Sequence, residues 1–261
     1  MVFVKIVYHP MMKESYDSTP AGATGRLDSA IQALSSVHGY KCIEPEPATQ
    51  EQLLRAHSSQ HIESVKRESE SRYGGRLYDV ALLAAGGAIK SARIAARGEP
   101  CFGLIRPPGH HASYDGYWGF CYFCNMAVAL LHLRAAGLIE RAFILDFDLH
   151  HGDGNVDILS RHNGFQIHNP RGRGDEEYLA DVERVMENMQ EVDIISASAG
   201  FDQYEHDWGG NLSTEAFGEI GRIIKRHSLE QCNGNRFALL EGGYNHADLG
   251  VNIRAFCNGL R

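Results

Sequence analysis

Four short segments of the sequence place carboxylate, imidazole or hydroxyl groups beside glycines, immediately after apolar runs. They are Arg106–His111, Asp146–Gly154, Ala199–Asp202 and Glu241–Tyr244. One such segment alone is about as often a capped strand end as part of a reactive site. In a sheet of parallel strands, however, ligands bind outside the carboxyl ends of the strands. Four segments of this kind in one chain therefore indicate a shared site.

Three side chains in these segments are suited to hold a metal ion. Asp148 and His150 are two residues apart, so on an extended strand end they point to the same side. Asp202, from another strand end, supplies a third ligand. Three protein ligands and an open position are typical of a catalytic metal site, where water is acidified and can attack a carbonyl. Such a set suits both Zn²⁺ and Fe²⁺.

The adjacent residues His110 and His111 are candidates for proton transfer. Each imidazole needs a partner that sets its tautomer, and Asp146 and Asp153 flank the metal segment. One histidine would serve as general base and the other as electrostatic stabiliser or acid. Tyr244 follows two glycines and can donate a hydrogen bond to an oxyanion. A lone histidine pair or a lone GGY is more often a simple turn.

The apolar pattern predicts the elements that position these groups. Six apolar runs predict buried strands, at Val2–Tyr8, Cys101–Ile105, Ala142–Phe147, Phe165–His168, Val192–Ala197 and Phe237–Leu240. Five segments predict helices, at Thr49–Val65, Leu82–Ala96, Asn125–Ala136, Tyr178–Met189 and Glu215–His227. Because strands and helices alternate, the sequence predicts a single α/β domain over residues 1–261, with three layers and a central, mainly parallel sheet.

Composition limits the classes of partner. The formal net charge of −8 disfavours a broad nucleic-acid-binding face, which needs clustered Lys and Arg. No apolar stretch is long enough to cross a bilayer, and the N-terminus has no signal-peptide pattern. The six scattered cysteines indicate reduced thiols rather than a disulfide framework. We therefore expect a cytoplasmic protein that does not bind nucleic acid or membranes; its oligomeric state stays open.

Five segments resemble the signature segments of the histone deacetylase family. They are RPPGHHA (106–112), GFCYF (119–123), DFDLHHGDG (146–154), SAGFD (198–202) and EGGYN (241–245). Their order and spacing extend the resemblance over nearly the whole chain, and the EGGY form is similar to the bacterial and class II members. The resemblance implies the arginase-deacetylase fold. It also implies a zinc-dependent hydrolase that removes acetyl or other short acyl groups from acylated amines, such as acetyl-lysine or acetylpolyamines.

The resemblance implies two ions. A zinc ion would be held by Asp148, His150 and Asp202, with Fe²⁺ as the other metal that suits these ligands. A structural potassium ion would be held nearby by Asp146, Asp148 and the backbone of His150.

The resemblance also implies roles for the remaining site residues. His110 and His111 match the paired catalytic histidines, with Asp146 and Asp153 as their carboxylate partners, and Tyr244 matches the carbonyl-polarising tyrosine. Gly119 and Phe120 match one wall of the acyl-lysine tunnel. Arg26 resembles the buried arginine near an internal product channel.

Several positions depart from the family pattern. The stretch 155–175 is short and lacks the aromatic residue that faces Phe120 in relatives, so backbone or Arg171 is expected there, giving a more open site. Gly209 stands where one animal member has a glutamate that selects acetylpolyamines. Cys124 replaces a usual asparagine and forms a CxxC with Cys121, which read alone suggests a redox pair or half a zinc site.

Two other functions remain open at this point. One is an arginase-like hydrolase with two metal ions, and the other is an inactive module that binds acylated amines. The first needs additional bridging carboxylates, and the second is expected to have lost some of the catalytic residues.

Overall fold

Seven parallel strands form one sheet in the computed structural model, which describes residues 3–35 and 39–261. The strand order is β2-β1-β3-β7-β6-β4-β5. The bounds of the strands are β1 Val4–Val7, β2 Tyr40–Ile43, β3 Cys101–Gly103, β4 Ala142–Asp146, β5 Phe165–His168, β6 Ile194–Ala199 and β7 Arg236–Leu240. Every pairing between these strands is parallel. The predicted parallel sheet is confirmed.

The four polar segments follow four neighbouring strands, β3, β7, β6 and β4. In the register of the sheet, Leu240 of β7 pairs with Ala199 of β6, and Ser198 of β6 pairs with Asp146 of β4. The strands therefore end at nearly the same level, and the segments that follow them emerge side by side.

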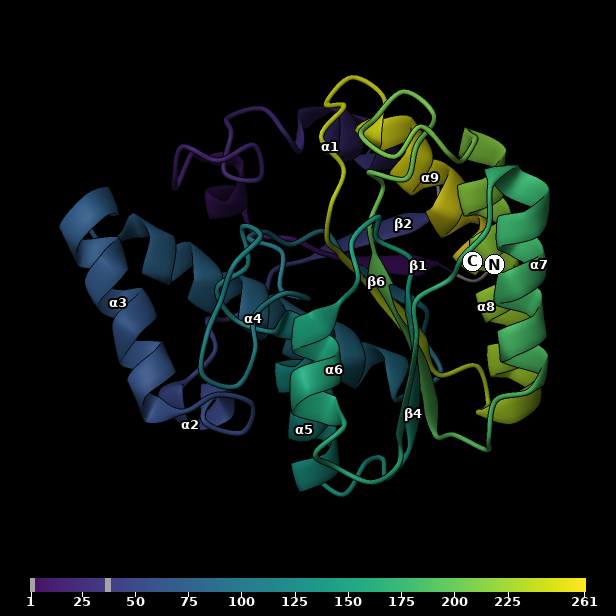
Figure 1. Cartoon of the computed structure of the whole chain (residues 1–261), viewed down its shortest axis with the longest axis horizontal. Coiled ribbons are helices and arrows are strands. Elements are labelled where there is room, and N and C mark those ends of the chain that lie inside the picture. The colour runs from purple at the N-terminus through teal and green to yellow at the C-terminus, as the bar shows by residue number, and fades with distance from the viewer. Residues whose placement is uncertain (1–2, 36–38) are drawn as a thin grey trace.

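Helices cover both faces of the sheet (Figure 1), with α3, α4, α5 and α6 on one side and α7, α8 and α9 on the other. Their bounds are α1 Asp28–Ser35, α2 Gln50–Leu53, α3 Ser59–Tyr73, α4 Arg76–Ala95, α5 Asn125–Ala135, α6 Asp153–Leu159, α7 Gly174–Glu187, α8 Thr214–Gln231 and α9 Leu249–Leu260, with a 3₁₀ turn η1 at Pro10–Lys13. Helix α4 packs against α5, and α8 packs against α7 and α9. This is the three-layer arrangement that the sequence predicts.

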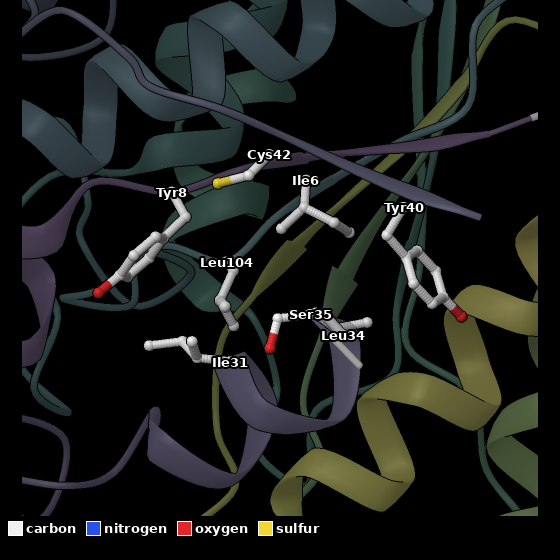
Figure 2. Close-up of a pocket in the computed structure, with 8 residues that line it drawn as sticks. All are labelled: Ile6, Tyr8, Ile31, Leu34, Ser35, Tyr40, Cys42 and Leu104. Carbon is white, nitrogen blue, oxygen red and sulfur yellow. The ribbon is translucent and has the colours of Figure 1, made fainter. Parts of the chain in front are cut away.

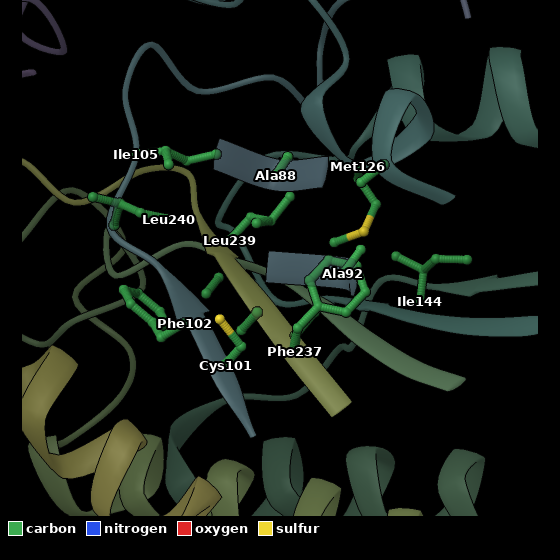
Figure 3. Close-up of a cluster of buried hydrophobic side chains, with 14 of the residues drawn as sticks. Ala88, Ala92, Cys101, Phe102, Ile105, Met126, Ile144, Phe237, Leu239 and Leu240 are labelled. Atoms are coloured by element: carbon green, nitrogen blue, oxygen red, sulfur yellow. The ribbon is translucent and has the colours of Figure 1, made fainter. Parts of the chain in front are cut away.

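The central strands are held by a core of apolar side chains (Figure 3). Phe237 and Leu239 of β7 are fully buried on the side of the sheet that faces α4. Phe102 of β3 is fully buried on the opposite side, where its ring contacts those of Phe201 and Phe256, the latter on α9. Ala88 and Ala92 on α4 are small, so the helix lies close to the sheet. Burial of each large apolar side chain contributes about 1.5–3 kcal/mol. This core fixes the positions of the strand ends that carry the polar segments.

Sequence patterning missed one strand and several helices. Strand β2 lies at the edge of the sheet and is only partly buried, so it lacks the continuous apolar run of a central strand. Helix α9 contains Gly250 and Gly259, which lower its helix propensity. Helices α1 and α6 were also missed. The predicted strand from Val2 begins outside the described residues.

The helix predicted over Thr49–Val65 is wrong in one respect, because it is two helices. Thr49 forms the expected capping box with Gln52 at the start of α2. Ser58 then caps α3 by accepting a hydrogen bond from the backbone of His61. Among the helices of residues 3–35 and 39–261, none has both the length and the apolar character to cross a membrane.

Candidate active site

Asp148, His150 and Asp202 lie together at the carboxyl edge of the sheet. Nδ1 of His150 is 3.1 Å from Oδ1 of Asp148 and 3.2 Å from Oδ2 of Asp202. Both carboxylates are buried, whereas the His150 side chain is 40% exposed. The structure thus brings the three residues that the sequence selected into one group that opens towards solvent on a single side.

The electrostatics of this group favour a cation. Burial and the nearby charge of Asp148 raise the pKa of Asp202 to about 6. Burial acts in the same direction on Asp148, but the positive charge of His110 and hydrogen bonds from His150 prevail and lower its pKa. Hydrogen bonds with Asp148 and Asp202 raise the pKa of His150 to about 10. Two buried carboxylates that both contact one imidazole need a positive charge between them, because like charges repel in a buried site.

A divalent metal fits the space as well as the charge. Oδ2 of Asp202 is buried, and apart from its contact with Nδ1 of His150 it has no hydrogen-bond donor. A Cβ atom at Gly242 would lie 2.5 Å from Oδ2 of Asp148 and from Oδ2 of Asp202, so only glycine leaves room beside both oxygens. One imidazole and two carboxylates are suitable ligands for Zn²⁺ or Fe²⁺.

Asp146, which precedes this group, also offers a cation an oxygen. Its Oδ1 is buried without a hydrogen-bond partner, while its Oδ2 accepts a hydrogen bond from Asn155 at 2.9 Å. A buried, unpaired carboxylate oxygen fits the potassium site that the resemblance implies at Asp146, Asp148 and the backbone of His150.

Each of the paired histidines contacts one of the two aspartates expected as their partners. Nδ1 of His110 is 3.3 Å from Oδ2 of Asp146, and Nδ1 of His111 donates to Oδ1 of Asp153 at 2.6 Å. The two imidazole centroids are 4.0 Å apart. Each His–Asp contact fixes the tautomer of its imidazole, because a carboxylate only accepts hydrogen bonds.

The environments of the two histidines drive their pKa values apart. Burial opposes protonation of His110, but the negative charges of Asp148 and Asp146 prevail and hold its pKa well above the ordinary value. Burial and the neighbouring His110 lower the pKa of His111, against the opposing effect of Asp153. Neighbouring groups with opposite shifts are typical of a separated acid and base.

Gly119 and Phe120 form a sharp turn beside His111. Both residues have positive φ angles, 59° and 66°. A Cβ atom at Gly119 would lie 2.3 Å from Cδ2 of His111, so this position needs glycine for its backbone and for its contact. The turn places Phe120 in a cavity of about 140 Å³, which is lined by Pro108, His110, His111, Trp118, Gly119, Phe120, His150, Trp208, Gly242 and Tyr244.

Tyr244 lies on the loop after β7 and forms part of the same cavity. The backbone N–H groups of Tyr244 and Asn245 donate to Oδ2 of Asp207 at 2.6 and 2.7 Å. Burial raises the pKa of the Tyr244 hydroxyl, so it stays a hydrogen-bond donor. Sequence reasoning did not find Asp207, although it lies five residues after Asp202 in the chain.

The expectation that no ring faces Phe120 is wrong. Trp208 lines the cavity, with its ring centroid 6.4 Å from that of Phe120 and 4.1 Å from that of Tyr244. The ring comes from the loop after β6 instead of the short stretch 155–175, and Arg171 does not line the cavity. One signal for this loop was present in the sequence, because the adjacent Gly209 stands where one animal member of the family has a substrate-selecting glutamate.

Arg26 and Glu241 lie behind the cavity. Arg26 is fully buried and donates to the carbonyl oxygens of Gly243 at 2.9 Å and Glu241 at 2.6 Å. The Glu241 carboxylate accepts hydrogen bonds from the backbone of Gly109 at 2.6 Å and His110 at 3.2 Å. These bonds tie the loops after β3 and β7 together and so hold His110 and Tyr244 in place.

The CxxC cysteines serve packing instead of redox chemistry. Sγ of Cys121 accepts a hydrogen bond from the backbone of His111, and Sγ of Cys124 donates to Oδ1 of Asn155. Both thiols are buried and unpaired with one another, and burial raises the pKa of each. Protonated, inaccessible thiols are poor nucleophiles.

A second cavity, of about 190 Å³, contains no comparable group (Figure 2). Side chains from β1, β2 and α1 line it, among them Ile6, Ile31, Leu34 and Cys42. Its lining is mostly apolar and has no carboxylate or imidazole. Of these two cavities, the one at His110 and His111 therefore has the groups suited to catalysis.

Comparison with known proteins agrees with this site. A model of the histone deacetylase domain matches residues 21–168 and 160–260. A probable deacetylase of Methanothermobacter thermautotrophicus is 33% identical over 91% of this chain and 84% of its own length. A histone deacetylase-like amidohydrolase of Pseudomonas aeruginosa is 29% identical, over 85% of this chain and 71% of its own. The chain therefore belongs to the histone deacetylase family.

Two further relatives bear on fold and substrate. The crystal structure of an HDA15 HD domain matches with a TM-score of 0.85 at 22% identity, over 97% of this chain and 87% of that one. This confirms the arginase-deacetylase fold. A polyamine deacetylase HDAC10 of Danio rerio is 27% identical over 87% of this chain and 42% of its own length. The names of these relatives confirm the expectation of a hydrolytic deacetylase.

Proposed function

We propose that the chain is a single zinc-dependent catalytic domain that hydrolyses the amide bond of acylated amines. One observation carries the proposal: a group of three metal ligands and two His–Asp pairs lie together at one cavity that aromatic rings line. Asp148, His150 and Asp202 would hold the zinc ion. When bound, the ion polarises the amide carbonyl and makes a neighbouring water molecule more acidic.

The protein groups around the cavity then manage protons and charge. His111 accepts a proton from the attacking water through the nitrogen not bonded to Asp153. His110, kept positive by Asp148 and Asp146, stabilises the negative charge that develops next to it. The Tyr244 hydroxyl donates a hydrogen bond to the carbonyl oxygen as its charge grows. The histidine pair finally delivers a proton to the leaving amine.

The cavity walls support a substrate with a narrow methylene chain next to the acylated nitrogen. Phe120 and Trp208 present rings on two sides of the cavity, and the Gly119 backbone lies directly against the His111 ring. Acetyl-lysine and acetylpolyamines both have such a chain, and the polyamine deacetylase among the relatives supports keeping both classes. We propose potassium as a structural ion at Asp146 and a cytoplasmic location, supported by six free cysteines.

The arginase-like alternative is less well supported. In the described part of the chain, the other group with metal-ligand geometry is His110, Cys121 and Glu241. It shares no residue with the Asp148 group, so no carboxylate bridges two ions there. An inactive binding module is also disfavoured, because all the expected catalytic side chains are present and gather at one cavity.

The direct test combines metal analysis with turnover. The purified chain should contain about one equivalent of zinc or iron and hydrolyse an acetyl-lysine reporter or an acetylpolyamine. A substrate panel of acetyl-lysine peptide, free acetyl-lysine, acetylpolyamine and longer acyl amides would define the class. Two equivalents of metal with arginine hydrolysis would favour the arginase-like function. Stoichiometric metal with no turnover of any amide would favour the binding module.

A further inference from the structure

Trp118 is exposed but firmly held at the mouth of the cavity. The residue is 55% exposed, yet its indole Nε1–H donates to Oδ2 of Asp153 at 2.8 Å. Its ring lies over His111, with ring centroids 3.9 Å apart and an interplanar angle of 32°. An exposed tryptophan normally gains little from a fixed position. Here both its polar atom and its ring contact one His–Asp pair.

The indole N–H is a second partner for Asp153, whose side chain would otherwise be held by His111 alone. Oδ1 accepts the hydrogen bond from His111, and the Asp153 side chain is 47% exposed. Without the indole, Oδ2 would face water and the carboxylate plane would be free to turn. With it, both carboxylate oxygens are bound, and the plane that orients the imidazole is fixed.

The aspartate of the other His–Asp pair also has a second side-chain donor, although this donor binds the same carboxylate oxygen as the histidine. Asp146, which contacts His110, is fully buried and accepts a second hydrogen bond from Nδ2 of Asn155 at 2.9 Å. Each histidine thus contacts an aspartate, and that aspartate in turn accepts a hydrogen bond from the N–H group of a third side chain. The donor is Asn155 in the interior and Trp118 at the surface.

We propose that Trp118 is a positioning residue for His111. Its N–H fixes Asp153, and its ring restricts rotation of the imidazole from the solvent side. The inference rests on the proposed function, in which His111 accepts the proton from water. Partners that orient a catalytic or ligating group commonly affect activity by about 10–100-fold when removed.

The kinetic test is Trp118→Phe, which keeps a ring and removes the N–H. We expect kcat to fall about 10-fold or more, with KM within about twofold, because substrate still meets an aromatic wall. Trp118→Ala, which also removes the stacked ring, should lower kcat further. The matched variant is Trp208→Phe: that ring also lines the cavity but contacts Tyr244, so its main effect should be on KM. Metal content and melting temperature are measured for all three.

The hydrogen bond itself can be observed by NMR spectroscopy without substrate. The chain has two tryptophans, so the ¹H–¹⁵N spectrum holds two indole signals, and Trp118→Phe assigns them. Asp153→Asn should shift the Trp118 signal upfield and leave that of Trp208 in place. His111→Ala should also move the Trp118 signal, because the ring above it is lost.

A Trp118→Phe enzyme with wild-type kcat would overturn the proposal, and a change confined to KM would make Trp118 only a wall of the cavity. An indole signal that ignores Asp153→Asn would overturn the hydrogen-bonded arrangement. If the wild-type chain hydrolysed no acylated amine, the proposed function would fail, and the NMR comparison would still decide whether Trp118 holds Asp153 and His111.

Discussion

Replacement of Tyr244 by phenylalanine isolates one hydroxyl group at the cavity. The phenylalanine ring retains the stack on Trp208 at 4.1 Å and the position beneath the Arg26 guanidinium at 5.1 Å. The loop is also retained, because Asp207 binds the backbone N–H of residue 244 and not its side chain. Tyr244→Phe should therefore fold and bind metal like the wild type.

The expected loss lies in the chemical step. Burial raises the pKa of the Tyr244 hydroxyl, so in the wild type it is a hydrogen-bond donor at neutral pH. Removal of one preorganised donor to an oxyanion costs about 10²–10³-fold in kcat, or about 2.7–4 kcal/mol. The contact strengthens as charge develops on the oxygen, so KM should change much less than kcat.

Steady-state kinetics on an acetyl-lysine reporter, with metal analysis of the same preparation, would measure both quantities. An unchanged kcat/KM would remove Tyr244 from the mechanism. A variant that lost its metal would show that the hydroxyl acts on the ion site instead of the substrate, which would also refute the assignment.

Three other perturbations follow from the geometry. Asp202→Asn should lose most of its metal by elemental analysis and its activity with it, and full occupancy would contradict the ligand assignment. Gly119→Ala should destabilise the chain and lower kcat at least about 10-fold, because the new Cβ would displace His111. Its control is Gly137→Ala, which has a similar φ of 68° but open space around it, and so measures the backbone strain alone, about 1–3 kcal/mol. If both variants lost the same stability and activity, the contact between residue 119 and His111 would be refuted. Burial lowers the pKa of His57 to about 3, below the ordinary 6.5, so its contribution to stability is full above pH 6.5 and is lost as pH falls towards 3. In denaturant unfolding, the free energy of unfolding of the wild type should be lower at pH 5 than above pH 6.5 by about 2 kcal/mol from this histidine, and His57→Gln should lack that decrease. If the stability of the wild type and of His57→Gln changed with pH in parallel, the prediction would be wrong.

Much of this protein follows from local signals in the sequence. Apolar runs predicted the central strands β3, β4, β6 and β7, because strands covered on both faces carry mostly apolar side chains. Those same strands end in the polar segments, so the candidate site was visible as residues that interrupt an apolar pattern. The edge strand β2 and the glycine-containing α9 gave no such signal.

The partnerships inside the site required the tertiary structure. The sequence offered Asp146 and Asp153 as partners for two histidines, but did not say which aspartate meets which. Their distances from His110 and His111 answer this, because they depend on how the loops after β3 and β4 cross.

The walls of the cavity also depended on the tertiary structure. The short stretch 155–175 suggested a missing ring, and the sequence could not reveal that Trp208, from another loop, takes its place. The sequence likewise assigned no role to Trp118, whose contacts with Asp153 and His111 join separate loops. Residue types and strand ends therefore determined which chemistry is available. Long-range packing of separate loops decided which groups touch, since contacts between distant segments leave no periodic trace in the chain.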